Sequence, residues 1–260
     1  MEQLLHWDAQ ALLWINGHHT PFLDWFMWYA TQSWVWIPLY LLMVFAIYKM
    51  ATSLEFNHSL EYERQDHMRT ATEIEKLSGG HKEKTDAKHR GWYIFLLVLL
   101  GVACIALAAG LSDYVTSGIL KKMICRPRPT HLGLAKYLHI VHGYTGGQYG
   151  FPSSHAANTF AVATCFMRVM RCLRNRPHEA VVRRIQDVWA VRALFSAMTV
   201  LLVIYVGLNC YSRMYLGVHY PLDILCGGAI GMLFGWLFGL LYDYVIRPIC
   251  GKQVRYIRVW

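Results

Sequence analysis

The stretch SRMYLGVHYPLD, residues 212–223, lies between two long apolar segments of the chain. LFSAMTVLLVIYVGLNC, residues 194–210, precedes it, and ILCGGAIGMLFGWLFGLL, residues 224–241, follows it. Each flank has nearly the length of about 20 residues that a helix needs to cross the hydrocarbon core of a bilayer. The stretch between them nevertheless holds an arginine, a histidine and an aspartate. Ionisable groups at the junction of two such segments need partners or a function.

Apolar residues also form blocks along the rest of the chain. Of its 260 residues, 55% are hydrophobic and only 16% are charged, which together with the blocks favours a membrane protein over a soluble one. We therefore predict an all-α integral membrane helical bundle. The expected spans are residues 25–49, 92–120, 154–173, 193–211 and 221–246. Residues 3–15 are too few to span and predict an N-terminal interfacial helix, so that the count is five spans, or six if this helix enters the membrane.

These blocks divide the chain into four parts. Residues 1–50 hold the interfacial helix and the first span, in which Pro38 predicts a kink, and they show no cleavable signal peptide. Residues 51–90 are polar and contain Gly79-Gly80, which predicts a cytoplasmic loop that is at most partly helical. Residues 91–246 form the expected core with four spans. Residues 247–260 form a basic cytoplasmic tail.

The positive charges are distributed unevenly between the two sides of the predicted bundle. Nineteen of the 25 lysines and arginines fall in residues 49–90, 168–192 and 247–260. The positive-inside rule places these three segments in the cytoplasm and the other loops outside. The net charge of +9 is therefore mainly a topology signal, and we expect no nucleic-acid partner. Six of the ten tryptophans lie in the first 36 residues, as an outward interfacial belt requires.

Three polar blocks lie at span ends on the predicted outward face. KKMICRPRP (121–129) follows the second span, PSSH (152–155) opens the third, and residues 212–223 join the fourth to the fifth. His219 and Asp223 are four residues apart and share a face if the helix has begun, so the carboxylate can hold the imidazole in one tautomer. Such a histidine is prepared as a nucleophile or base, and His155 is a second titratable group that can act as a general acid.

Cations complete this constellation. Three of them can donate hydrogen bonds to an anion: Lys121, Arg128 and Arg213. The N-termini of the helices near Ser154 and Pro221 add backbone donors. Two histidines, three cations and one carboxylate describe a phosphate-transfer site that needs no metal, because such donors stabilise charge on the oxygens of a transferring phosphoryl group.

The three blocks resemble the signature motifs of the type-2 phosphatidic acid phosphatase superfamily. These motifs are K-x6-R-P, P-S-G-H and S-R-x5-H-x3-D, and their order and internal spacing match this chain between about Trp92 and Ile246. One position departs from the pattern, because Ser154 stands where the family has glycine. The backbone amide of a serine can still donate to phosphate, and its hydroxyl adds a further donor.

The resemblance implies a role for each residue. His219 attacks phosphorus and becomes a phosphohistidine, Asp223 orients it, and His155 protonates the leaving oxygen and then activates water. The phosphate oxygens are held by Lys121, Arg128, Ser153, Arg213 and the backbone at Ser154. The resemblance implies neither a metal nor another cofactor.

The function implied is hydrolysis of a lipid phosphomonoester or diphosphate at the outer face of a bacterial inner membrane. There a headgroup can reach the site while its chains stay in the bilayer. Relatives act on undecaprenyl diphosphate, lipid A, phosphatidylglycerol phosphate or phosphatidate, and no feature specifies an oligomeric state. Two alternatives stay open: a lipid phosphotransferase that uses the same site, and a non-enzymatic lipid carrier.

Other residues allow two interpretations each. Asp113, inside the second span, is either a functional acid or a buried hydrogen-bond partner between helices. Arg126 lies outside the motif register and contacts either an anionic headgroup or nothing. GYTGGQYGF, residues 143–151, is a mobile lid or a plain loop. The loop histidines lack cysteine or carboxylate companions, so we expect no metal site at them: His131, His139 and His142.

Overall fold

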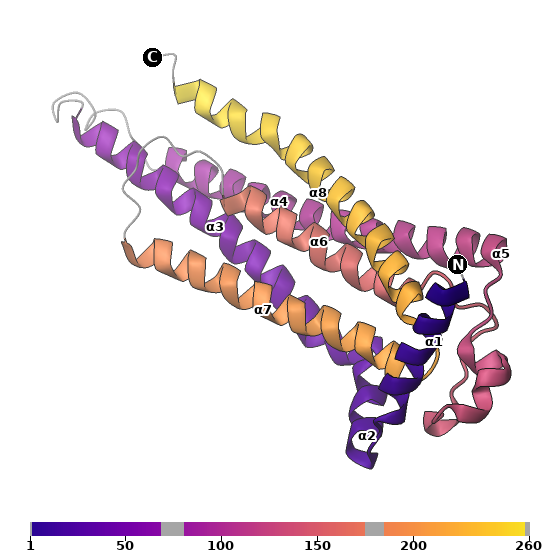
Figure 1. The fold of residues 1–260 in the computed structure, drawn as a ribbon. Helices are drawn as coiled ribbons and strands as arrows, with labels where there is room; N and C mark the ends of the chain where they lie inside the picture. The colour runs from indigo at the N-terminus through magenta and orange to yellow at the C-terminus, as the bar shows by residue number, and fades with distance from the viewer. Residues whose placement is uncertain (1, 69–80, 175–184, 258–260) are drawn as a thin grey trace.

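The structure is a computed structural model that describes the backbone of residues 2–68, 81–174 and 185–257. Side chains are described for residues 2–52, 91–174 and 189–247. Within these residues the regular elements are helices and no strand is present, which confirms the all-α prediction. Figure 1 shows five long helices, α3, α4, α6, α7 and α8, running alongside one another as a bundle, with α1 and α2 at one end.

The N-terminal region forms two short helices before the bundle begins. α1 covers Glu2–Gly17 and α2 covers Pro21–Ala30. Thr20 separates them, because its side-chain oxygen accepts from the backbone N–H of Leu23 and caps α2, whose first residue is a proline. The chain then turns through the 3-10 segment η1 (Ser33–Trp36) into the bundle.

The first long helix, α3, runs over Ile37–Met68. The prediction of a span that starts at residue 25 is therefore wrong at its N-terminal end. Pro38 does not kink a span either, since it lies in the first turn of α3, where its missing N–H costs no helical hydrogen bond. The prediction joined α2, η1 and α3 into one span because η1, with the sequence SWVW, is itself apolar and does not interrupt the run of apolar residues.

The second long helix changes its winding before it ends. α4 (His81–Asp113) continues into the π-helical segment η2 (Tyr114–Leu120) and then into α5 (Lys121–Ile124). Cys125 follows with φ 51°, in the left-handed region, and breaks the helix. Three 3-10 turns shape the connection to α6: η3 (Pro129–His131), η4 (Gly133–Tyr137) and η5 (Val141–Gly143).

The remaining long helices are α6 (Ser154–Arg174), α7 (Ile185–Tyr215) and α8 (Pro221–Ile257). Four segments of the described residues are long and apolar enough to cross a membrane: Ser33–Thr52, Gly91–Ile124, Trp189–Tyr215 and Pro221–Arg247. They correspond to four of the five predicted spans. The fifth, α6, is less apolar, and it packs against α4, α7 and α8 in the interior of the bundle.

The polar segment 51–90 is more helical than predicted. α3 continues to Met68 and α4 already begins at His81, while the Gly79-Gly80 pair lies outside the described residues. Extending an existing helix costs little once its first turn has formed, and residues 51–68 contain neither glycine nor proline. α8 likewise runs through most of the predicted basic tail, to Ile257, although that segment contains Pro248 and Gly251.

The glycines that recur every four residues in α8 allow this helix to pack closely against α6. A Cβ on Gly231 would lie 2.8 Å from the carbonyl carbon of Ala157, and one on Gly235 would lie 2.6 Å from the carbonyl oxygen of Ala161. The stripe begins with Gly227, where a Cβ would meet the carbonyl oxygen of Ser153. The backbones of the two helices therefore touch, which fixes where their N-terminal ends lie.

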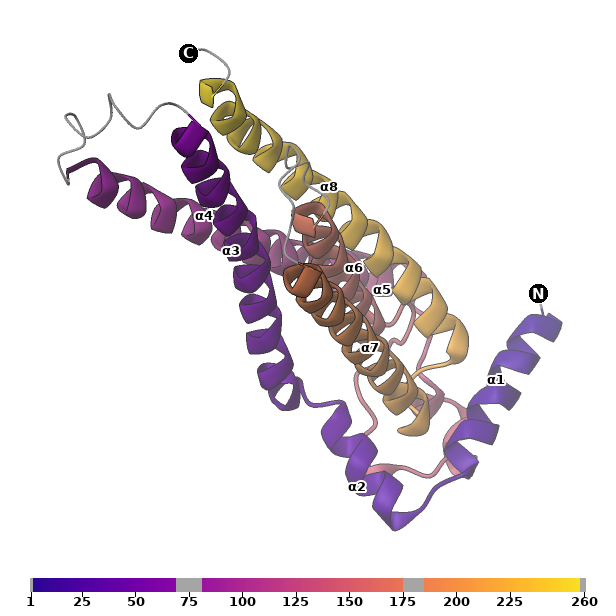
Figure 2. The same cartoon turned by 90° about the vertical axis from the view of Figure 1, so that its left-hand side faces the viewer.

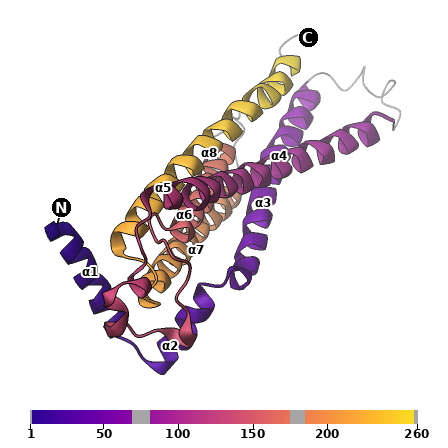
Figure 3. The same cartoon turned by 90° about the vertical axis from the view of Figure 1, so that its right-hand side faces the viewer.

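Figures 2 and 3 show what gathers at each end of the bundle. α1, α2, the loop after α5 and the first turns of α6 and α8 lie at one end, and the C-terminal part of α8 lies at the other. The three polar blocks of the sequence thus meet at a single end, as the topology argument required.

The close approach of α6 and α8 generates a stability prediction. Gly231→Ala places a methyl group against the backbone of Ala157, so we expect a loss of about 1–3 kcal/mol from overpacking. Gly110→Ala is the matched control, because nothing lies within 4 Å of its Cβ and alanine favours a helix. Thermal unfolding in detergent should show a lower midpoint for Gly231→Ala only. Equal midpoints would contradict the packing described.

Candidate active site

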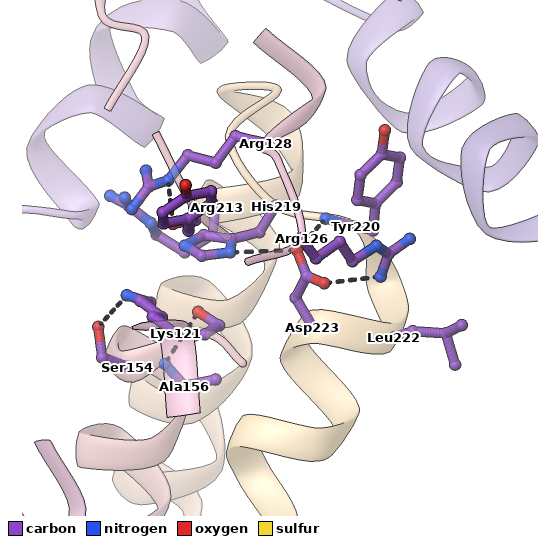
Figure 4. A network of polar contacts seen from close by, with 12 residues as sticks. Lys121, Arg126, Arg128, Ser154, Ala156, Arg213, His219, Tyr220, Leu222 and Asp223 are labelled. Carbon is purple, nitrogen blue, oxygen red and sulfur yellow. Dashed lines mark hydrogen bonds and ion pairs between the residues drawn. The ribbon is translucent and has the colours of Figure 1, made fainter. Parts of the chain in front are cut away.

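The site forms where the end of α7 passes into α8. Arg213 lies in the last turn of α7, the turn of residues 216–220 carries His219, and Asp223 lies in the first turn of α8. All three are buried, with exposed fractions of 2% or less. Figure 4 shows Arg128, Arg213 and His219 gathered over Lys121 and Ser154.

His219 and Asp223 meet, but not on one helical face. α8 begins only at Pro221, so His219 precedes the helix. The turn, in which Gly217 has φ 71°, brings Nδ1 of His219 to 3.4 Å from Oδ2 of Asp223. The same carboxylate oxygen accepts the backbone N–H of Tyr220 at 3.0 Å. Asp223 therefore holds the histidine and the start of the helix together.

The other ring nitrogen of His219, Nε2, is buried and has no hydrogen-bond partner. Burial, followed by the charges of Arg213 and Arg128, lowers the pKa of the His219 imidazole well below its ordinary value. The ring is therefore neutral near pH 7. With its Nδ1 facing a carboxylate, it can present an Nε2 lone pair to a substrate.

Arg213 and Arg128 also carry unpaired buried nitrogens. Nη1 of Arg213 donates to Thr31 Oγ1 at 2.7 Å and Nη2 donates to the Tyr144 hydroxyl at 3.1 Å, which leaves Nε free. Nη1 of Arg128 is likewise without a partner. Buried donors without acceptors are rare because each costs desolvation energy, so two beside His219 Nε2 mark a place prepared for an anion.

The 143–151 segment wraps around Arg128. Arg128 donates from its backbone N–H to the carbonyl of Gln148 and from Nε to that of Tyr149. Gly146, at φ 68°, lies so close that a Cβ there would be 2.8 Å from Arg128 Cζ. At Gly150 a Cβ would lie 3.0 Å from Asp223 Oδ2. The segment is therefore in direct contact with the site. Its glycines allow the backbone to lie close to the charged groups.

Lys121 of α5 and Ser154 at the start of α6 contact each other. Lys121 Nζ donates to Ser154 Oγ at 2.9 Å, so the hydroxyl that replaces the glycine of the motif has a partner. The π-helical segment η2 ends directly before Lys121. A π turn changes the rotational register of the residues that follow it, which helps to set the direction in which the lysine points.

The other PSSH residues occupy the start of α6. Ser153 is fully buried, its backbone N–H donates to the carbonyl of Asp223, and its Oγ lies 3.5 Å from the N–H of Ala156. His155 follows in the first turn and is close enough to act electrostatically on His219. The structure thus brings together all eight residues that the motifs predict.

The sequence did not predict the contacts of Arg126. Its Nη1 donates to Asp223 Oδ1 at 2.8 Å and its Nη2 donates to Asp8 Oδ2 at 2.7 Å, so the interpretation that it contacts nothing is wrong. Its guanidinium also lies 4.1 Å from the ring centroid of Tyr220. The only signal in the sequence was an unexplained arginine on the outward side. Its partner Asp8 lies 118 residues away, beyond the reach of any local pattern.

The structure also gives contacts for other positions that the sequence left open. Asp113 accepts hydrogen bonds from Asn158 of α6 and from Ser117, which supports the interpretation of a buried link between helices. His139 pairs with Asp24 at 2.9 Å and stacks on His19. In the part of the chain described here, no group of three or more histidine, cysteine, aspartate or glutamate side chains is arranged to hold a metal ion.

Fold and site together define a helical bundle with candidate membrane spans and a cluster of cationic side chains around His219 at one end. A model of the PAP2 superfamily matches residues 92–247, and the chain belongs to this superfamily. It is 28% identical over 233 residues to a lipid A 4'-phosphatase of Bacteroides thetaiotaomicron, covering 89% of this chain and 75% of that protein. A lipid A 4'-phosphatase of Porphyromonas gingivalis is 25% identical over 245 residues, covering 94% and 76%.

The fold has a solved counterpart. The crystal structure of a transmembrane PAP2-type phosphatidylglycerolphosphate phosphatase from Bacillus subtilis aligns over 95% of this chain and 90% of that one, with a TM-score of 0.51 and 17% identity. The protein is a multi-pass membrane lipid phosphatase. The non-enzymatic carrier that the sequence left open finds no support among these relatives.

The packing of Gly146 on Arg128 can be tested by substitution. Gly146→Ala should displace the guanidinium and strain a left-handed backbone position, which removes a charged donor from the site. We expect kcat/KM for lipid phosphate to fall roughly 10- to 100-fold. Gly147→Ala is the neighbouring control, since nothing lies within 4 Å of its Cβ. Phosphate-release kinetics that do not distinguish the two variants would show that Arg128 does not depend on this contact.

Proposed function

We propose that the protein hydrolyses a phosphate monoester of a lipid of the bacterial envelope and releases inorganic phosphate. The leading substrate is lipid A, and the reaction passes through a phosphohistidine on His219. The observation that carries this proposal is a group of three buried nitrogens without partners at this end of the bundle: Nε2 of His219, Nη1 of Arg128 and Nε of Arg213. A phosphoryl group offers the acceptors that the two guanidinium groups lack and the electrophile that a neutral imidazole can attack.

In the first step, His219 Nε2 forms a bond to phosphorus while the bond to the lipid oxygen breaks. The carboxylate of Asp223 beside Nδ1 stabilises the positive charge that develops on the ring. His155, at the start of α6, takes up a proton as the negatively charged phosphate binds beside it and delivers that proton to the departing lipid oxygen. Charge on the phosphoryl oxygens is met by Lys121, Arg128, Arg213, Ser153 and the backbone at Ser154.

In the second step, water attacks phosphorus from the side opposite His219. His155, now neutral, takes a proton from that water, and the bond between phosphorus and Nε2 breaks. Inorganic phosphate leaves, and His219 and His155 return to their starting states. The cationic side chains do the work that a divalent metal does in other phosphatases, so the proposed reaction needs no metal or other cofactor.

The relatives favour lipid A among the lipid phosphates that the sequence left open. Two lipid A 4'-phosphatases match 89% and 94% of this chain, so the likeness extends beyond residues 92–247, the part that the family model matches. We infer that residues 1–50 are an addition shared with such enzymes and that residues 91–246 form the catalytic core. Undecaprenyl diphosphate, phosphatidylglycerol phosphate and phosphatidate are the comparison substrates.

We also propose that the site faces the periplasm from the inner membrane. The segments rich in lysine and arginine adjoin the end of the bundle opposite the site, and the positive-inside rule assigns that end to the cytoplasm. Trp7, Trp14, Trp25 and Trp34, each more than half exposed, lie on the same side as the site. A lipid in the outer leaflet then has its phosphate at the depth of His219.

The nucleophile can be tested directly. His219→Ala should lower turnover about a thousandfold or more, because no other group forms the covalent intermediate. Brief reaction of the wild type with lipid labelled at the phosphate, followed by an alkaline quench, should leave label on His219, and His155→Ala should slow its formation. Near wild-type turnover in His219→Ala would end the nucleophile assignment.

The substrate and the reaction type are tested with a panel of lipid phosphates in mixed micelles containing chelator. We expect lipid A to release free phosphate fastest, with activity unchanged by the chelator and inhibited by vanadate, which imitates pentacoordinate phosphorus. A phosphorylated acceptor with little free phosphate would instead identify a phosphotransferase. Strict dependence on a divalent metal would overturn the proposed mechanism.

A further inference from the structure

The buried face of the N-terminal helix α1 is unusual for a helix at a membrane surface. Its fully buried residues are Asp8, Leu12 and Asn16, which recur every four positions and so share one face. Two of the three are polar, whereas the exposed side chains of this helix include Trp7 and Trp14. A helix that serves only as an interfacial anchor has no use for buried polar groups, because burying them costs free energy unless they are paired.

Both polar residues are paired, and their partners flank His219. Asp8 Oδ1 accepts the backbone N–H of Leu222 at 2.8 Å. Asn16 Nδ2 donates to the carbonyl of Tyr215 at 2.7 Å. Tyr215 directly precedes the turn of residues 216–220, and Leu222 follows Pro221 in the first turn of α8, so α1 holds the segment that carries His219 on both sides.

Asn16 also contacts the loop between α5 and α6. Its Nδ2 donates to the carbonyl of His139 at 2.9 Å and its Oδ1 accepts the N–H of His139 at 2.7 Å. The amide thus bonds to backbone on two sides, and its position is fixed by both. The C-terminal end of α1 is tied to the end of α7 by groups that carry no net charge.

Near the middle of α1, at Asp8, the link is ionic and leads to the proposed site. Arg126 stands between Asp8 and Asp223, one nitrogen on each carboxylate, with its plane over the Tyr220 ring. The two carboxylates are 1% and 0% exposed, and the arginine is 19% exposed. Water therefore screens these pairs weakly, and the direction of each hydrogen bond restricts where the Asp223 carboxylate can sit.

We propose that α1 is a strap that sets the position of His219, and that Asp8, Arg126 and Asn16 are positioning residues for the phosphoryl transfer. The proposal rests on the function proposed above. Asp223 has one oxygen toward His219 and the other toward Arg126. A shift of Arg126 would therefore move the carboxylate, and with it the tautomer and aim of the imidazole.

The test compares Asp8→Asn with wild type. Asparagine keeps the size of the side chain and the oxygen that accepts from Leu222, and it loses the charge that holds Arg126. Glu2→Gln is the charge-matched control on the same helix, at an exposed position. We expect kcat for phosphate release to fall about tenfold in Asp8→Asn with KM within about threefold, because positioning acts on the transition state. Glu2→Gln should match the wild type.

A purely structural role gives a different result. In that case Asp8→Asn lowers the unfolding midpoint or the yield of monodisperse protein, while kcat of the monodisperse fraction stays at the wild-type value. Kinetics are therefore measured on that fraction, well below the unfolding midpoint. An unchanged kcat overturns the proposal, whatever happens to stability.

A double-mutant cycle identifies the route of the effect. If Asp8 acts through Arg126, Asp8→Asn combined with Arg126→Gln should lose no more kcat than Arg126→Gln alone. Asn16→Ala acts at the other end of α1, so its loss should multiply with that of Asp8→Asn. Losses of Asp8→Asn and Arg126→Gln that simply multiply would show that the chain of three charged groups is not the route.

His219→Ala belongs in the same series, so that the two proposals can fail separately. Loss of activity in His219→Ala together with a fully active Asp8→Asn overturns the strap alone. Full activity in His219→Ala overturns the catalytic assignment, and the strap with it.

Discussion

The structure depends on holding several positive side chains, out of water, around one neutral histidine. Arg213 and Arg128 are 2% and 8% exposed, and each keeps one nitrogen without an acceptor. Like charges at close range repel, and each buried unpaired donor costs desolvation energy, so this arrangement is unfavourable until an anion enters. The rest of the fold offsets that cost by supplying neutral partners. Thr31 and Tyr144 bind Arg213, and the carbonyl of Tyr149 binds Arg128.

Close packing of the helices determines where those partners lie. The glycines of α8 allow its backbone to touch that of α6, which sets Ser153 against the carbonyl of Asp223. The first turns of two helices are thereby fixed relative to each other with no side chain between them. Arg213 then reaches Thr31 at the N-terminal side of the bundle, so residues 182 positions apart are joined at the site. The packing of the helix interiors thus fixes the positions of the helix ends, and the site is built from those ends.

The sequence predicted much of this site because its chemistry is local. Residues with fixed spacing in the three blocks, such as His219 and Asp223, meet as expected, although the helix begins after His219 rather than before it. Arg126 and Asp8 were not predicted, since a contact between distant residues leaves no periodic trace. The length of α3 and α4 was underestimated because polar composition says little about whether an existing helix continues. The start of the first span was missed because an apolar 3-10 turn imitates a helix in hydropathy.

The serine that replaces the glycine of the family pattern has a consequence for affinity. In the structure its hydroxyl already accepts a hydrogen bond from Lys121, which restricts where the ammonium group sits. An ammonium group has three N–H bonds, so Lys121 can keep this bond and still donate to an anion. The hydroxyl of Ser154 retains its own hydrogen and can donate to the same anion. A glycine would leave the lysine to be ordered by its ligand alone, whereas the serine orders it before any ligand binds.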